Sequence, residues 1–185
     1  MRDLILPFLF VLFGAGGVAA QTASPYWGYA AIERTLNARI GARGDSFQMY
    51  MYVGPGPVSL LGTYQGGAFR NGLPSPTNLM LWKIAMTGIA RDIAKTCMAQ
   101  EQERFNAEFL AAVSHLCRWP AASAQTDAVL EDLWLALMGY SAPEEEYLAW
   151  RGFLKSDYMQ KLDAGQAVTA MATAILMNPH FLLRK

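Results

Sequence analysis

Glycine and alanine divide this chain of 185 residues near residue 75, and the division limits what each part can form. Nine glycines lie in the 45 residues from Gly28 to Gly72, whereas four lie in the 113 residues from Leu73 to Lys185. Alanine, the best helix former, is dense in the second part, and glycine favours turns and loops. We therefore expect a single domain over residues 21–185. A glycine- and aromatic-rich, partly β and partly irregular segment (21–75) would pack on a compact, mainly α bundle of about five helices (76–185).

The hydrophobic spacing of the second part predicts where its helices lie. The longest is expected from about Pro76 to Thr96, since its apolar residues recur every three or four positions. Asn106 is an expected N-cap. Another helix is expected to start near residue 126 and to end at Gly139, which would adopt the left-handed conformation. Ser141 and Glu144 have the spacing of a capping box at the start of a fourth helix. A last helix is expected over about residues 164–177, before Asn178-Pro179.

The first part gives weaker signals. Residues 26–40 have the pattern of an opening helix. Apolar and polar side chains then alternate from Phe47 to Val53, which predicts a strand, and Val58 to Tyr64 is an expected return strand. Glycine-containing turns are expected at residues 65–67 and 70–72.

The first twenty residues have the pattern of a secretory signal peptide. Arg2 precedes the apolar run from Leu4 to Phe13, and the small residues before Gln21 fit cleavage after Ala20. The alternative is an uncleaved anchor, because 17 uncharged positions reach the lower limit for crossing a bilayer. We expect a periplasmic or secreted bacterial protein, with membrane attachment only if this segment is retained.

Two cysteines, Cys97 and Cys117, are the only ones in the chain. In an exported protein such a pair most often forms one disulfide. The alternative is a reactive thiol pair, but the spacings CxxC and CxxCH are absent.

The sequence offers little for catalysis or metal binding. Its 15 basic and 15 acidic residues balance, whereas proteins that bind nucleic acid usually carry a basic excess. His115 and His180 are the only histidines, too few for a metal site by themselves. The ten methionines are spaced as core fillers rather than as copper ligands. Glu144–Glu146 fit the first turn of a helix, where the helix dipole favours negative charge, rather than a catalytic pair. The motifs GxSxG and HExxH and the phosphate loop are absent. We expect no metal and no cofactor.

A nearly uncharged, aromatic stretch is the most distinctive region. Between Asp45 and Lys83 the single charged residue is Arg70. Such a stretch is expected to be covered, either by the protein's own helices or by a partner. In the second case we expect Tyr50, Tyr52, Phe69 and Arg70 in the interface, because tyrosine and arginine often dominate binding energy.

The last sixty residues carry a family resemblance. A helix ending at Gly139, the start at Ser141-Ala142-Pro143-Glu144 and the final run Ile175-Leu176-Met177-Asn178-Pro179-His180-Phe181-Leu182-Leu183-Arg184 are similar to the helical domains of unknown function that accompany c-type cytochrome domains in large exported bacterial proteins. Those domains share an "ILxSPHFLxR" ending. The resemblance covers about a third of the chain. It implies an exported helical domain and names no catalytic residue.

These observations favour an exported, non-enzymatic accessory or interaction subunit of a bacterial cell-envelope complex, with another envelope protein as its partner. Two alternatives stay open. One is a cell-envelope enzyme, and the other is a protein that binds a small ligand or a glycan, in either case with a cleft near Arg70.

Overall fold

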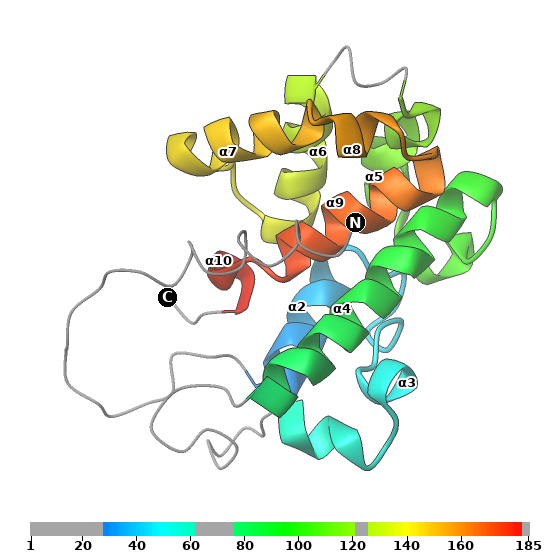
Figure 1. Cartoon of the computed structure of the whole chain (residues 1–185). Coiled ribbons are helices and arrows are strands. Elements are labelled where there is room, and N and C mark those ends of the chain that lie inside the picture. The colour runs from blue at the N-terminus through cyan, green and yellow to red at the C-terminus, as the bar shows by residue number, and fades with distance from the viewer. Residues whose placement is uncertain (1–27, 62–75, 121–125, 183–185) are drawn as a thin grey trace.

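The computed structural model describes residues 28–61, 76–120 and 126–182, and over these residues the protein is mainly helical (Figure 1). The expected signal peptide, both expected glycine turns, Phe69 and Arg70 lie outside the described residues. No helix of the described part combines the length and the apolar character that crossing a membrane requires.

Two long helices form the centre of the molecule. Helix α4 (Pro76–Lys95) and helix α9 (Ala164–Leu176) lie side by side and run in opposite directions (Figure 1). Both are amphipathic at helical spacing, so each buries one stripe. The buried side chains of the two helices include Trp82, Ala85, Met86, Ile89, Ile93, Ala167, Val168, Met171 and Ile175. The expected long helix is therefore confirmed, together with the stripe that defined it.

The other expected helices of the second part are also present. Helix α5 (Ala107–Val113) is capped by Asn106, whose side chain accepts a hydrogen bond from the Phe109 backbone N–H. Helix α6 (Thr126–Met138) is followed by Gly139 at φ +75°, the left-handed conformation expected there. Helix α7 (Glu144–Leu154) and two single-turn helices, α8 (Asp157–Gln160) and α10 (Pro179–Leu182), complete this part.

The predicted capping box at the start of α7 is wrong. Pro143 occupies the N-cap position, and no side chain caps this end of the helix. A capping box forms instead at α9, where the Asp163 side chain accepts from the Gln166 N–H and the Gln166 side chain accepts from the Asp163 N–H. Helix α7 therefore starts two residues later than a cap at Ser141 would require.

The predicted strand from Phe47 to Val53 is also wrong. Phe47 and Met49 are fully buried, as their alternation indicated, but the chain then coils into α3 (Tyr50–Val53). A 3₁₀ helix, η2 (Pro57–Leu61), stands where the return strand was expected to begin. In the described residues the one β-type pairing is an isolated bridge between Gly41 and Phe105.

Helix α2 (Tyr29–Arg39) explains why the chain turns at Phe47. The Asn37 side chain donates to the Phe47 carbonyl at 3.0 Å and accepts from the Phe47 N–H at 2.8 Å. The Glu33 carboxylate accepts from the Met49 N–H at 2.5 Å. These side chains form hydrogen bonds with backbone groups that would otherwise pair with a neighbouring strand.

Cys97 and Cys117 form the expected disulfide, with their Cα atoms 5.1 Å apart. Cys97 lies in η4 (Thr96–Met98), directly after α4, and Cys117 lies in η6 (Ser114–Arg118), directly after α5. The segment between them includes η5 (Gln102–Arg104). The bond therefore fixes the end of the central helix to the end of α5.

Candidate functional site

Tyr52 of α3 packs directly on the backbone of α4 at Gly88. A methyl group added to Gly88 would overlap the Tyr52 ring atom Cδ1 and would lie 3.1 Å from Cε1. Only glycine leaves room for a ring at this distance from the helix. Gly88 is therefore the position at which α3 packs most closely on the central helix.

The Tyr52 hydroxyl lies between an acid and a base. It donates to Asp92 Oδ2 at 2.9 Å and accepts from Arg104 Nη2 at 2.8 Å. Arg104 Nη1 is also bonded to Asp92 Oδ2, and Lys95 Nζ lies 2.9 Å from Asp92 Oδ1. Because the Asp92 side chain is only 9% exposed, these three partners compensate a nearly buried carboxylate.

Arg104 connects this cluster to the loop before α3. Its Nη2 donates to the Ser46 carbonyl at 2.8 Å, and its guanidinium lies over the rings of Phe47 and Tyr52, 5.1 and 5.8 Å from their centroids. The Arg104 carbonyl accepts from the Ala42 N–H at 2.9 Å. One residue thus holds α3, α4 and the segment after α2 together.

The surroundings shift the pKa values of the cluster. Burial, reinforced by the Asp92 charge, raises the pKa of Tyr52 well above that of a free tyrosine. Burial alone would lower the pKa of Arg104, but the neighbouring Tyr52 and Asp92 raise it above its ordinary value. The hydrogen bond to Asp92 raises the pKa of Lys95. The cluster therefore holds a neutral tyrosine and permanent cations at neutral pH, which suits a structural role.

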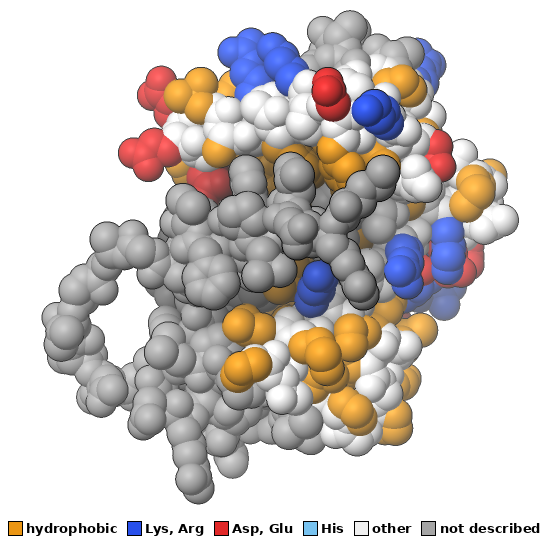
Figure 2. Space-filling view, in the orientation of Figure 1, with side chains coloured by type: hydrophobic (Ala, Val, Ile, Leu, Met, Phe, Trp, Pro, Cys, Tyr) orange, Lys and Arg blue, Asp and Glu red, His pale blue; other side chains and the backbone are white. Residues whose placement is uncertain are grey.

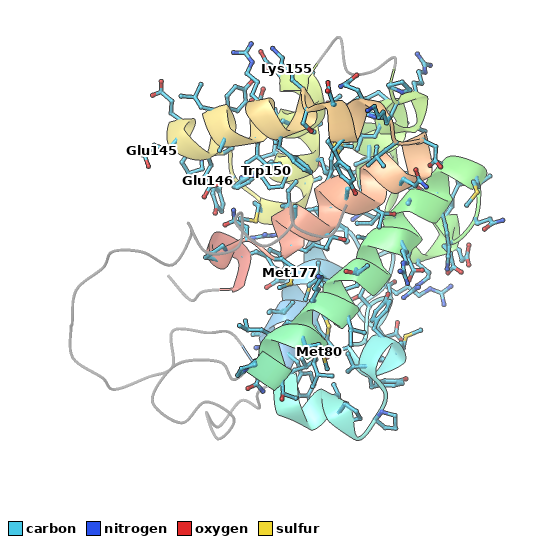
Figure 3. The ribbon with its side chains drawn as sticks, in the orientation of Figure 1. Met80, Glu145, Glu146, Trp150, Lys155 and Met177 are labelled. Atoms are coloured by element: carbon cyan, nitrogen blue, oxygen red, sulfur yellow. A yellow bond between two sulfur atoms is a disulfide. The ribbon has the colours of Figure 1, made fainter. Side chains whose placement is uncertain are left out.

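Next to this anchored helix lies an exposed apolar surface. Tyr50 and Met51 of α3 are 50% and 55% exposed, and Met80 and Ile84 of α4 are 57% and 45% exposed. Ile84 precedes Gly88 by one helical turn, and Met80 precedes Ile84 by another, so the row that Tyr52 covers at Gly88 continues uncovered. Figure 2 shows hydrophobic side chains gathered over this part of α4, around the position that Figure 3 labels Met80.

Two cations stand on the same side of α4. Lys83 and Arg91 are exposed. Lys83 follows Met80 by three residues and Arg91 follows Ile84 by seven, so each cation lies on the same side of the helix as an exposed apolar residue. We define the α3–α4 face as the exposed side chains of these two helices: Tyr50, Met51, Met80, Lys83, Ile84 and Arg91. It is the candidate interaction surface of this protein.

The structure brings together only part of the predicted interface. Tyr50 is exposed and therefore accessible to a partner, whereas Tyr52 is half-buried and its hydroxyl bonds to Asp92 and Arg104. Phe69 and Arg70 lie outside the described residues, so a cleft near Arg70 is not described either. Sequence reasoning missed Asp92 and Arg104. The available signal was an acidic residue between Ile89 and Ile93, on the apolar stripe of a predicted helix.

A second surface feature is an open depression beside α2, lined by Arg34, Ala38, Gly41, Arg43 and their neighbours. The Asn37 side chain also lines it, but both of its polar atoms are bonded to Phe47. Among the described residues no group of three His, Cys, Asp or Glu side chains could hold a metal ion. The α3–α4 face is thus the stronger candidate.

Comparisons with known proteins identify no relative: no family model, no curated protein and no solved structure matches this chain. The resemblance of its last sixty residues to exported helical domains therefore stays a prediction.

Proposed function

We propose that this chain is an exported, non-enzymatic accessory subunit of a bacterial cell-envelope complex, and that it binds another envelope protein through the α3–α4 face. The observation that carries the proposal is the set of large, half-exposed apolar side chains on two helices that are fixed to each other. Exposed apolar side chains that cluster rather than scatter are typical of protein interaction sites.

The rigidity of the face supports this function. The Tyr52, Asp92 and Arg104 cluster holds α3 on α4, and the fit of the Tyr52 ring at Gly88 leaves little freedom between them. A surface that is already ordered before binding loses less conformational entropy when a partner arrives. The disulfide at the end of α4 adds a covalent constraint that suits an oxidising compartment.

In this proposal the first twenty residues act as a signal peptide and are removed after Ala20. The mass of the protein purified from its native host tests the location. A mature chain that begins at Gln21 supports export, whereas a chain that keeps residues 1–20 in the membrane fraction indicates an anchor.

Site-specific photo-crosslinking in the native host tests the function. A photoreactive amino acid is placed at Met51 or Met80 on the proposed face, and at Leu148 on α7 as a control, since Leu148 is 60% exposed. We expect Met51 and Met80 to crosslink the same envelope protein. If neither Met51 nor Met80 yields a crosslinked protein, the proposed function is wrong.

A further inference from the structure

The α3–α4 face carries positive charge only. From Ser46 to Arg91 the sequence contains Arg70, Lys83 and Arg91 and no Asp or Glu. Of these, Lys83 and Arg91 are exposed on the face itself. A chain whose basic and acidic residues balance overall therefore presents a local basic surface here.

Three carboxylates on the elements around the face are already bonded to other groups, whereas Asp45, in the loop before α3, is exposed. Glu33 accepts a hydrogen bond from the Met49 N–H. Asp92 is bonded to Tyr52, Lys95 and Arg104, and its side chain is 9% exposed. Glu101 lies 3.6 Å from both Lys95 and Arg104. None of these three acids is bonded to Lys83 or Arg91 in the described structure.

Two further exposed acids lie away from the face. Glu144 and Glu145 begin α7 and are exposed. Figures 2 and 3 show that this end of α7 is far from Met80, and Figure 2 shows no acidic side chain over the apolar part of α4. Such a separation of charge favours encounter with partners of opposite sign and suppresses the others.

The residue types of the face indicate a protein rather than a bilayer as the occupant. Tyrosine, methionine and arginine are enriched in the cores of protein interfaces, and they make up four of the six side chains that define this face. Lipid-binding patches usually carry clusters of about 4–8 basic residues, whereas this face carries Lys83 and Arg91.

We infer that the partner is a protein that presents an apolar centre flanked by carboxylates, which meet Lys83 and Arg91 while the centre covers Met80, Ile84 and Met51. This inference rests on the proposed function and names the chemistry of the partner at that same surface. A second copy of the chain and an anionic bilayer are the other occupants that the experiment separates.

The test uses the mature full-length chain and the envelope protein crosslinked at Met80, purified separately. Binding is measured by calorimetry for the wild type and for Lys83→Glu/Arg91→Glu. We expect this double variant to lower the affinity by about tenfold or more, and wild-type affinity to fall between about 0.15 M and about 1 M salt. Met80→Ser/Ile84→Ser is expected to weaken binding without changing its salt dependence.

The matched control is Lys155→Glu/Lys161→Glu, which makes the same change of net charge at two exposed lysines outside the face. We expect it to change the affinity by less than about twofold. Circular dichroism and unfolding midpoints establish that each variant is folded.

An equal effect of the two charge-reversal variants would overturn the inference while leaving the proposed function intact. A crosslinked partner found only from Leu148 would overturn both, because the proposed function places the partner on the α3–α4 face. Crosslinks that join two copies of the chain would replace the partner with self-association. Sedimentation of the wild type, but not of Lys83→Glu/Arg91→Glu, with vesicles of phosphatidylethanolamine and phosphatidylglycerol would replace it with a bilayer. If no position crosslinks any protein, both proposals fail.

Discussion

The packing of α3 on α4 depends on Gly88. Its missing side chain leaves the space that the Tyr52 ring occupies, and the ring in turn brings the hydroxyl to Asp92 and Arg104. Glycine normally weakens the middle of a helix by about 0.5–1 kcal/mol relative to alanine. Its presence in α4 therefore has a packing reason.

Gly88→Ala is expected to lower the free energy of unfolding. Forcing a methyl group into a filled space costs about 1–3 kcal/mol, which exceeds the gain in helix propensity. Urea unfolding measures the change. Gly152→Ala in α7 is the matched control, because nothing lies within 4 Å of an added methyl group there, and we expect it to stabilise the protein by up to about 1 kcal/mol. Two variants that shift stability in the same direction would contradict this account.

Tyr52 is also expected to make stability depend on alkaline pH. Because burial raises the pKa of its hydroxyl, the folded state keeps this proton when the unfolded chain, with a tyrosine pKa of about 10, has lost it. The stability that this difference contributes is present below about pH 10 and is lost as the pH rises further. Tyr52→Phe removes the titrating group.

We therefore expect the wild type to lose stability more steeply than Tyr52→Phe between about pH 9 and 11, as urea midpoints would show. Tyr158→Phe is the control, because Tyr158 is 62% exposed. Its pH profile should follow that of the wild type. Parallel profiles for the wild type and Tyr52→Phe would mean that Tyr52 is not held as described.

At the scale of elements, long periodic helices were predictable and the residues that begin them were not. The stripe of α4 extends over five turns, so many residues agree on one assignment. The predicted start of α7 depended on the short run from Ser141 to Glu144. Pro143, extended at ψ 150°, takes the N-cap position instead.

The two capping sites give a paired prediction. Asp163→Ala removes a cap that accepts from the Gln166 N–H at 2.8 Å, so we expect it to lower the free energy of unfolding by about 1 kcal/mol. Ser141→Ala removes no capping bond and should change stability by less than about 0.5 kcal/mol. Chemical denaturation of both variants tests the pair, and a reversed order of effects would favour the capping box at Ser141.

The predicted strand failed for a reason that belongs to the same scale. Alternation from Phe47 to Val53 correctly marked Phe47 and Met49 as buried, but burial at every second residue does not require a partner strand. Asn37 and Glu33 supply hydrogen bonds from side chains, and α3 then forms its own. No local pattern reports where those two side chains will lie.

At the scale of the whole molecule, the disulfide and the Arg104 cluster stabilise the same segment, the one between α4 and α5. Cys97 and Cys117 enclose the segment that carries Arg104, which holds α3 on α4. Between them they connect the centre of the bundle to the α3–α4 face.

Removal of the disulfide is expected to destabilise the protein. A loop of 20 residues predicts a loss of about 3 kcal/mol in Cys97→Ala/Cys117→Ala, mainly because the unfolded chain gains freedom. Denaturant unfolding of oxidised wild type and double variant measures it. A thiol titration of the denatured, unreduced wild type should find no free thiol, and two free thiols would refute the bond.

The sequence by itself determined the helical class, the long central helix, the cap at Asn106, the left-handed Gly139 and the disulfide. These follow from local periodicity, backbone sterics and the presence of only two cysteines. Only the tertiary structure decided that Tyr52 faces Asp92 and Arg104, and that Tyr50 and Met51 stay exposed beside Met80 and Ile84. Those contacts join residues up to 52 positions apart. Which of them form depends on the packing of whole helices and on the missing side chain at Gly88.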